Sequence, residues 1–129
     1  MIKEIKVGKK TYGLIIDLAD AVSGAHPATD PRWPLQLLLM KRPKGHVVPK
    51  HMHKRLPRIT RQPQEALVLV RGEVRVVICD RKKKRIGTYT VKAGQCLFLA
   101  DGGHEVTFTK NTIAYEFKTG PYVADKISL

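Results

Sequence analysis

Residues 45–72 read GHVVPKHMHKRLPRITRQPQEALVLVRG. This stretch places His51 and His53 two positions apart and closes with an apolar run that begins at Glu65 and stops at Gly72. In an extended strand, side chains at positions i and i+2 point to the same side. We therefore predict that the two histidines lie on one strand and aim both imidazoles at one point, where Glu65 offers a carboxylate from a neighbouring strand.

Short apolar or alternating segments recur between turn signals on both sides of this stretch. A loop is expected at residues 20–34, which contain three prolines, because proline cannot donate a ladder hydrogen bond. Roughly ten short strands with regular turns are typical of an all-β sandwich or barrel. The strands are expected at residues 2–7, 12–18, 35–40, 47–53, 65–70, 72–80, 85–92, 96–99, 106–108 and 113–117.

The length of the chain, 129 residues, fits one domain with one core, so residues 1–129 are taken as a single domain. No apolar run approaches the ~20 residues of a membrane span, and the N-terminal residues carry no apolar leader. We therefore expect a cytoplasmic location and no membrane partner. Cys79 and Cys96 lie in apolar segments and are expected to be free, buried thiols, although their separation in space stays open.

The formal net charge of +13 predicts an anionic partner. The cations collect at residues 41–61 and 81–85, and few aromatic residues lie between them to stack on bases. This pattern disfavours a dedicated nucleic-acid-binding protein and favours a small anionic molecule. The run at 81–85 is expected to be a solvated hairpin turn.

Both faces of the segment at residues 65–70 are apolar. A strand of this kind is covered on both sides. A second subunit is the simplest cover for the outer face, so the sequence predicts a homodimer.

Two groups of residues resemble the signature motifs of the cupin superfamily, and in particular the small single-domain bacterial cupins. The first motif is matched by Gly45, His51, His53, Glu65 and Gly72, and the second by Gly94, Leu97, Phe98, Leu99, Gly102 and His104. The resemblance covers residues 41–117 and implies a cupin-type jelly roll, or double-stranded β-helix. It also implies a divalent transition metal (Mn, Fe, Co, Ni, Cu or Zn) held by His51, His53, Glu65 and His104.

Three departures separate the chain from the family pattern. Residues 54–64 form a longer gap between His53 and Glu65 than the family has, Ala100 replaces a proline, and His104 falls one residue early after Gly94. We interpret the longer gap as a loop insertion near the mouth of the site.

The arginines of this insertion, Arg55, Arg58 and Arg61, are the residues we expect to recruit an anionic substrate, because guanidinium groups bind carboxylate and phosphate bidentately. The resemblance implies an enzyme of dioxygenase, isomerase or decarboxylase type. Two alternatives stay open: a metal-independent carbohydrate isomerase or epimerase with a histidine as general base, and a non-catalytic binding or sensory module.

Overall fold

The computed structural model describes residues 2–129, and the fold is built from ten β-strands, with no α-helix among these residues. The all-β class predicted from the sequence is confirmed. One short 3-10 helix, η1 (Leu18–Asp20), follows the second strand. The strands are β1 (Ile2–Val7), β2 (Lys10–Asp17), β3 (Gly24–Pro27), β4 (Leu38–Lys41), β5 (Glu65–Arg71), β6 (Glu73–Cys79), β7 (Arg85–Lys92), β8 (Gln95–Leu99), β9 (Gly103–Phe108) and β10 (Ile113–Lys118).

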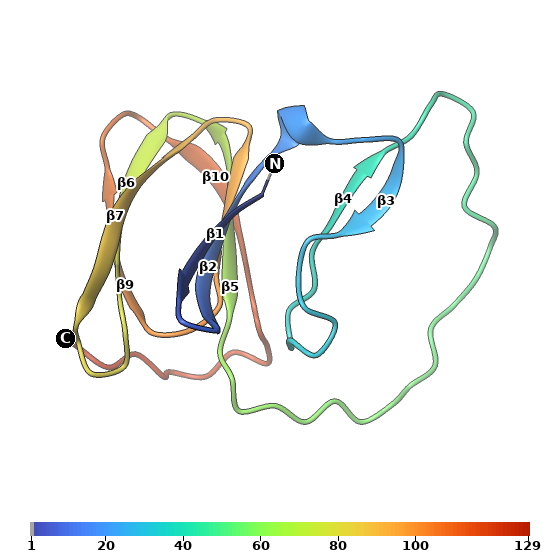
Figure 1. The fold of residues 1–129 in the computed structure, drawn as a ribbon. Helices are drawn as coiled ribbons and strands as arrows, with labels where there is room; N and C mark the ends of the chain where they lie inside the picture. Colours follow the sequence, from blue (N-terminus) through green and yellow to red (C-terminus); the bar gives the residue numbers. More distant parts are fainter. Residues whose placement is uncertain (1) are drawn as a thin grey trace.

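Two antiparallel sheets make up the body of the molecule (Figure 1). The larger has the strand order β1-β2-β8-β5-β10 and the smaller has the order β7-β6-β9. The two sheets share a buried core but no hydrogen-bonded ladder joins them within residues 2–129. The structure is therefore a β-sandwich, and it contains no closed barrel.

Alternation along each strand separates this core from the outer faces. On β6, Val74, Val76 and Ile78 are fully buried, while Arg75 between them is exposed. From the larger sheet, residues such as Leu69 pack into the same cluster. Burying a side chain of this size contributes about 1.5–3 kcal/mol, so the period-two pattern fixes which face of each strand points inward.

The outer face of the larger sheet is covered by the same chain. A two-stranded sheet of β3 and β4, together with the loop that joins them, packs beside β8 and β5. Trp33 of that loop stacks on the buried Phe98, with ring centroids 5.5 Å apart. The second apolar face of β5 therefore has its cover within one subunit, and the homodimer stays a prediction.

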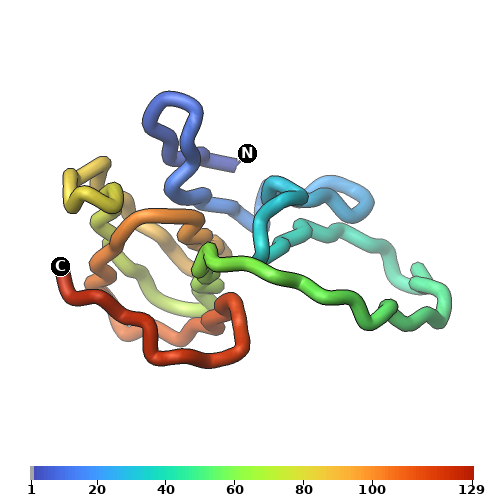
Figure 2. Tube along the Cα trace, turned by 90° about the horizontal axis from the view of Figure 1, so that it is seen from below, coloured from blue at the N-terminus to red at the C-terminus, as the bar shows by residue number. Residues whose placement is uncertain are grey.

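Two segments differ from the sequence-based prediction. Residues 47–53 form no strand, although their residue types and spacing favoured one. They belong to a segment, residues 42–64, that runs outside the sandwich between β4 and β5 (Figures 1 and 2). Conversely, a loop was expected at residues 20–34, but four of these residues form β3. They form a strand because they pair with β4.

Other local features agree with the sequence in part. Cys79 and Cys96 are both free, as predicted, but only Cys96 is buried, and burial raises the pKa of its thiol to about 11, whereas Cys79 is partly exposed. The charged run at residues 81–85 includes the turn between β6 and β7, as expected. Among the described residues, no helix has the length and apolar character that a membrane crossing requires.

Candidate functional site

Three ionisable side chains from three strands meet at one end of the sandwich. Glu65 opens β5 and shares a face with Leu67 and Leu69, which pack in the core. Its Oε1 lies 2.7 Å from Nε2 of His104 on β9, so the pair bridges the two sheets. Glu116 on β10 lies opposite Leu67 and therefore on the same inner face.

The surroundings of the two carboxyl groups push their pKa values apart. The hydrogen bond with His104 is the main reason that the pKa of Glu65 falls below its ordinary value. Burial first, and then the hydrogen bond with Glu65, raise the pKa of Glu116. Two carboxyl groups whose pKa values shift in opposite directions, next to an imidazole, are an arrangement suited to general acid–base chemistry.

This end of the sandwich remains open to solvent while its backbone is fixed. The side chains of Glu65 and His104 keep 22% and 35% of their surface exposed, so a small molecule could reach them. The neighbouring Gln64 is only 4% exposed, and its amide donates to the carbonyl of Ala100 at 3.2 Å. Its own carbonyl accepts from the Thr119 N–H at 3.0 Å. These bonds hold the start of β5, and with it the position of Glu65.

Two cations lie beside these carboxyl groups. Lys118 Nζ is 3.8 Å from Glu116 Oε2, and the charge of Lys126 in the C-terminal segment also acts on Glu116. Figure 1 shows that segment running along the end of the sandwich at which the 42–64 segment joins β5. A small anion bound here would meet positive charge as well as the acid–base groups.

The structure does not bring the two histidines of the opening stretch to this site. His51 and His53 are exposed on the 42–64 segment, with their ring centroids 5.1 Å apart. Arg55, Arg58 and Arg61 are exposed on the same segment. The four residues that the cupin resemblance implies as ligands thus form two separate pairs, Glu65 with His104 and His51 with His53.

A metal centre therefore does not assemble from the arrangement of these side chains. Among residues 2–129, no group of three or more His, Cys, Asp or Glu side chains has a geometry that could hold a metal ion. The paired imidazoles on one segment and the carboxylate–imidazole pair at the sandwich end are two separate donor sets. The residues as placed do not fit a single four-ligand site.

Glu116 is the member of the site that sequence reasoning missed. In the segment IAYEFK, alternation alone would turn Tyr115 and Phe117 inward and Glu116 outward, whereas in the structure both aromatic residues are mostly exposed. The sequence therefore carried no local signal for Glu116. Its proximity to Glu65 depends on the pairing of β10 with β5, which local sequence does not specify.

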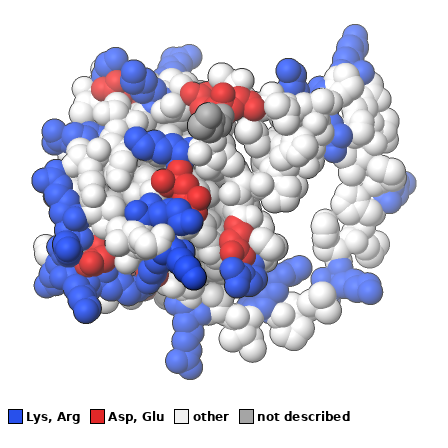
Figure 3. Space-filling model, viewed as in Figure 1, with Lys and Arg blue, Asp and Glu red and all other residues white. Residues whose placement is uncertain are grey.

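Lys and Arg outnumber Asp and Glu in the chain, 24 to 11. Figure 3 shows Lys and Arg on the left side of the sandwich and along the 42–64 segment, with several acidic side chains on the sandwich. Comparisons of the chain with protein-family models, with curated proteins and with solved structures gave no match. The site is therefore interpreted from its own chemistry.

Proposed function

We propose that this protein is a cupin-type β-sandwich enzyme that binds a small anionic molecule beside Glu65, His104 and Glu116 and transfers protons on it. The contact of 2.7 Å between Glu65 and His104 carries the proposal, because it joins a base and an imidazole from two sheets at a solvent-accessible end. Lys118 and Lys126 support the choice of an anionic substrate.

The chemistry that fits best is isomerisation next to a carbonyl group. The Glu65–His104 pair removes a proton from the carbon beside the carbonyl, and the Glu116 carboxylic acid donates a proton to the carbonyl oxygen. On a substrate with a hydroxyl group on that carbon, the product of this step is an enediol. A proton then adds to the former carbonyl carbon and the original hydroxyl group loses its proton, which completes the isomerisation with no net gain or loss of atoms. Positioned acid–base groups of this kind contribute about 10²–10⁴-fold to such steps.

The test is exchange of substrate protons with solvent. The full chain is incubated in D2O with a panel of carbonyl-bearing sugar phosphates and 2-keto acids, and deuterium incorporation is followed by NMR. The wild type is expected to exchange at least one compound, and Glu65→Gln, His104→Gln and Glu116→Gln are each expected to slow exchange about 10²-fold or more. Glu4→Gln on the exposed edge strand β1 is the matched control and should exchange at the wild-type rate.

Equal rates in all four variants would contradict the proposal. Binding of a panel compound without any exchange would instead support the non-catalytic binding module.

A second candidate is a metal-binding cupin that uses His51, His53, Glu65 and His104. The proximity of the two imidazole rings, 5.1 Å between centroids, favours it, but the 42–64 segment must first meet the sandwich end of its own or a second copy. Elemental analysis of protein purified without added metal tests it. A transition metal lost in both His51→Ala and His104→Ala would support this candidate, and its absence from the wild type would oppose it.

A further inference from the structure

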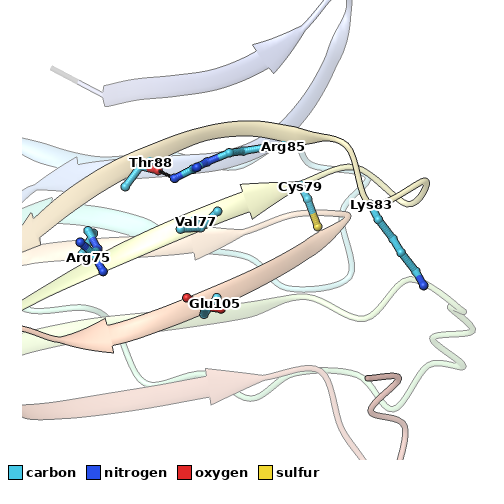
Figure 4. Close-up of a pocket in the computed structure, with 7 residues that line it drawn as sticks. All are labelled: Arg75, Val77, Cys79, Lys83, Arg85, Thr88 and Glu105. Atoms are coloured by element: carbon cyan, nitrogen blue, oxygen red, sulfur yellow. Dashed lines mark hydrogen bonds between the residues drawn. The ribbon is translucent and has the colours of Figure 1, made fainter. Parts of the chain in front are cut away.

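The outer face of the smaller sheet contains a groove that the proposed function does not use. It is shallow, with a volume of about 420 Å³, and it lies across β6, β7, β9 and the β6–β7 turn (Figure 4). β9 carries His104 on its inner face and Glu105 on this outer face. The groove is thus separated from the Glu65–His104 pair by the thickness of the sheet.

Three cations line this groove. Arg75 lies on β6, Arg85 opens β7, and Lys83 sits in the turn between the two strands with a φ of 69°. Within residues 2–129 none of the three forms an ion pair, whereas the neighbouring Arg81 pairs with Asp101. Their charge is therefore available to a ligand.

The floor of the groove is made of small side chains, and it offers both a hydroxyl group and a carboxylate to a ligand. Val77 on β6 lies opposite Thr88 on β7 and Glu105 on β9. The Arg85 guanidinium donates a hydrogen bond to the Thr88 hydroxyl and so extends along the groove over this floor (Figure 4). Glu105 is the one carboxylate that lines the groove, and within the described residues it takes part in no ion pair.

These groups together select the class of ligand. Two guanidinium groups favour a phosphate, which accepts several charge-assisted hydrogen bonds at once. The Glu105 carboxylate repels a purely anionic molecule but accepts hydrogen bonds from hydroxyl groups. We propose that the groove binds a phosphate monoester of a polyol, with the phosphate on Arg75 and Arg85 and the hydroxyl groups on Glu105.

The experiment uses 2-glycerophosphate as the probe, with inorganic phosphate and glycerol as comparisons. Binding to the full chain is measured by calorimetry at an ionic strength of about 0.15 M, where the Debye length is about 8 Å, and mapped by amide chemical shifts. Saturable binding of 2-glycerophosphate is expected, with shift changes on β6, β7 and β9. Arg75→Gln/Arg85→Gln is expected to weaken it about tenfold or more, because two charge-assisted hydrogen-bonding groups are lost.

The matched control is Arg71→Gln/Lys92→Gln, which removes the same charge from exposed positions outside the groove. It should leave affinity within about twofold, since long-range attraction alone is weak at these separations. Glu105→Gln is expected to reduce the preference for 2-glycerophosphate over inorganic phosphate. The proposal would be overturned if both double variants weakened binding equally, or if neither phosphate probe bound saturably. It would also be overturned if Glu105→Gln left the preference for 2-glycerophosphate over inorganic phosphate unchanged.

Discussion

Asp101 links the start of β2 to the turn between β6 and β7 through a single carboxylate. It pairs with Lys10 Nζ at 2.7 Å and with Arg81 Nε at 2.8 Å, and it accepts the Gly102 N–H at 2.7 Å. Burial opposes the charged form of Asp101, but the hydrogen bond from Lys10 and the other contacts outweigh it. The pKa of Asp101 therefore falls from its ordinary value of 3.8 to about 2.

A folded-state pKa below the ordinary value means that this carboxylate stabilises the fold above about pH 3.8 and that the contribution is lost as the pH falls through about 2. Asp101→Asn is expected to lower the free energy of unfolding by about 1 kcal/mol at pH 7, because both ion pairs are partly exposed. Urea denaturation from pH 7 to pH 2.5 checks this. The difference from wild type should shrink toward the acid end, and a constant difference would contradict the assignment. Asp125→Asn in the exposed C-terminal segment is the control.

The cupin resemblance implied Glu65 and His104 as two of four metal ligands. The structure places these two side chains in direct contact, and their role as ligands stays a prediction. The prediction that His51 and His53 join them assumed a strand at residues 47–53 and a partner strand to orient it. No local pattern reveals whether such a partner exists, because ladder hydrogen bonds come from distant segments.

Among the elements, the β3–β4 unit owes its position to side-chain packing. It is hydrogen bonded within itself and belongs to neither sheet of the sandwich. Trp33, Leu35 and Leu37 reach the buried cluster around Phe98. Aromatic stacking and apolar burial thus hold this unit against β8.

Trp33→Ala is expected to release this unit while the sandwich stays folded. The loss of a partly buried stacked ring corresponds to about 1–2 kcal/mol. Amide hydrogen exchange should accelerate at residues 24–27 and 38–41 and stay slow on β6. Trp33→Phe, which keeps a ring over Phe98, should behave like the wild type. Uniform acceleration over all strands in Trp33→Ala would show that the unit does not open separately.

Gly72 makes the tight connection between β5 and β6 possible. Its φ is 92°, and a Cβ at this position would overlap the backbone at Asn111 and Thr112. A side chain would add steric overlap to the strain of a left-handed conformation.

Gly72→Ala should therefore lower the free energy of unfolding by about 2–4 kcal/mol. Gly8→Ala is the control, since Gly8 has a φ of 61° but open space around its Cβ position. It should cost about 1 kcal/mol, from backbone strain alone. Chemical denaturation of both variants measures the difference, and equal losses would exclude a steric contribution at Gly72.

Alternating strands were the elements best predicted by the sequence. β1 and β7 have the predicted bounds, because each mixes polar and apolar residues and ends at a turn that contains glycine, Gly8 after β1 and Gly94 after β7. β3 was missed since Gly, His and Pro give no alternation, and its pairing with β4 depends on main-chain hydrogen bonds alone. Residues 47–53 show the reverse: their sequence pattern is typical of a strand, but they form none, because no other strand within residues 2–129 pairs with them.

At the scale of the whole molecule, apolar side chains are exposed at several positions outside the core, and two groups of them bear on assembly. Met52 and Ile59 on the 42–64 segment are 91% and 94% exposed. Tyr115 and Phe117 stand on the outer face of β10, which is an edge strand of the larger sheet. Exposed apolar surface combined with an unpaired edge is typical of a protein–protein interface.

We therefore predict a homodimer in which the 42–64 segment contributes to the interface. Sedimentation velocity over a concentration series should show a dimer for the wild type. Met52→Ser/Ile59→Ser should raise the dimer dissociation constant about tenfold or more, because two large apolar side chains lose their burial. Leu18→Ser, at another exposed apolar position, should leave it unchanged. A wild-type monomer at every concentration would reject the dimer.

The exposed 42–64 segment is where a protease is expected to cut the chain first. Lys54, Arg55, Arg58 and Arg61 are trypsin sites in exposed backbone without secondary structure, so limited digestion should cut here first. β2, before the cut, is hydrogen bonded to β8, after it. The two fragments should therefore co-elute as one folded particle on gel filtration and separate only in denaturant. Such a chain could be produced as two independent polypeptides that reassemble, since the peptide link between them contributes little to what holds the sheets together.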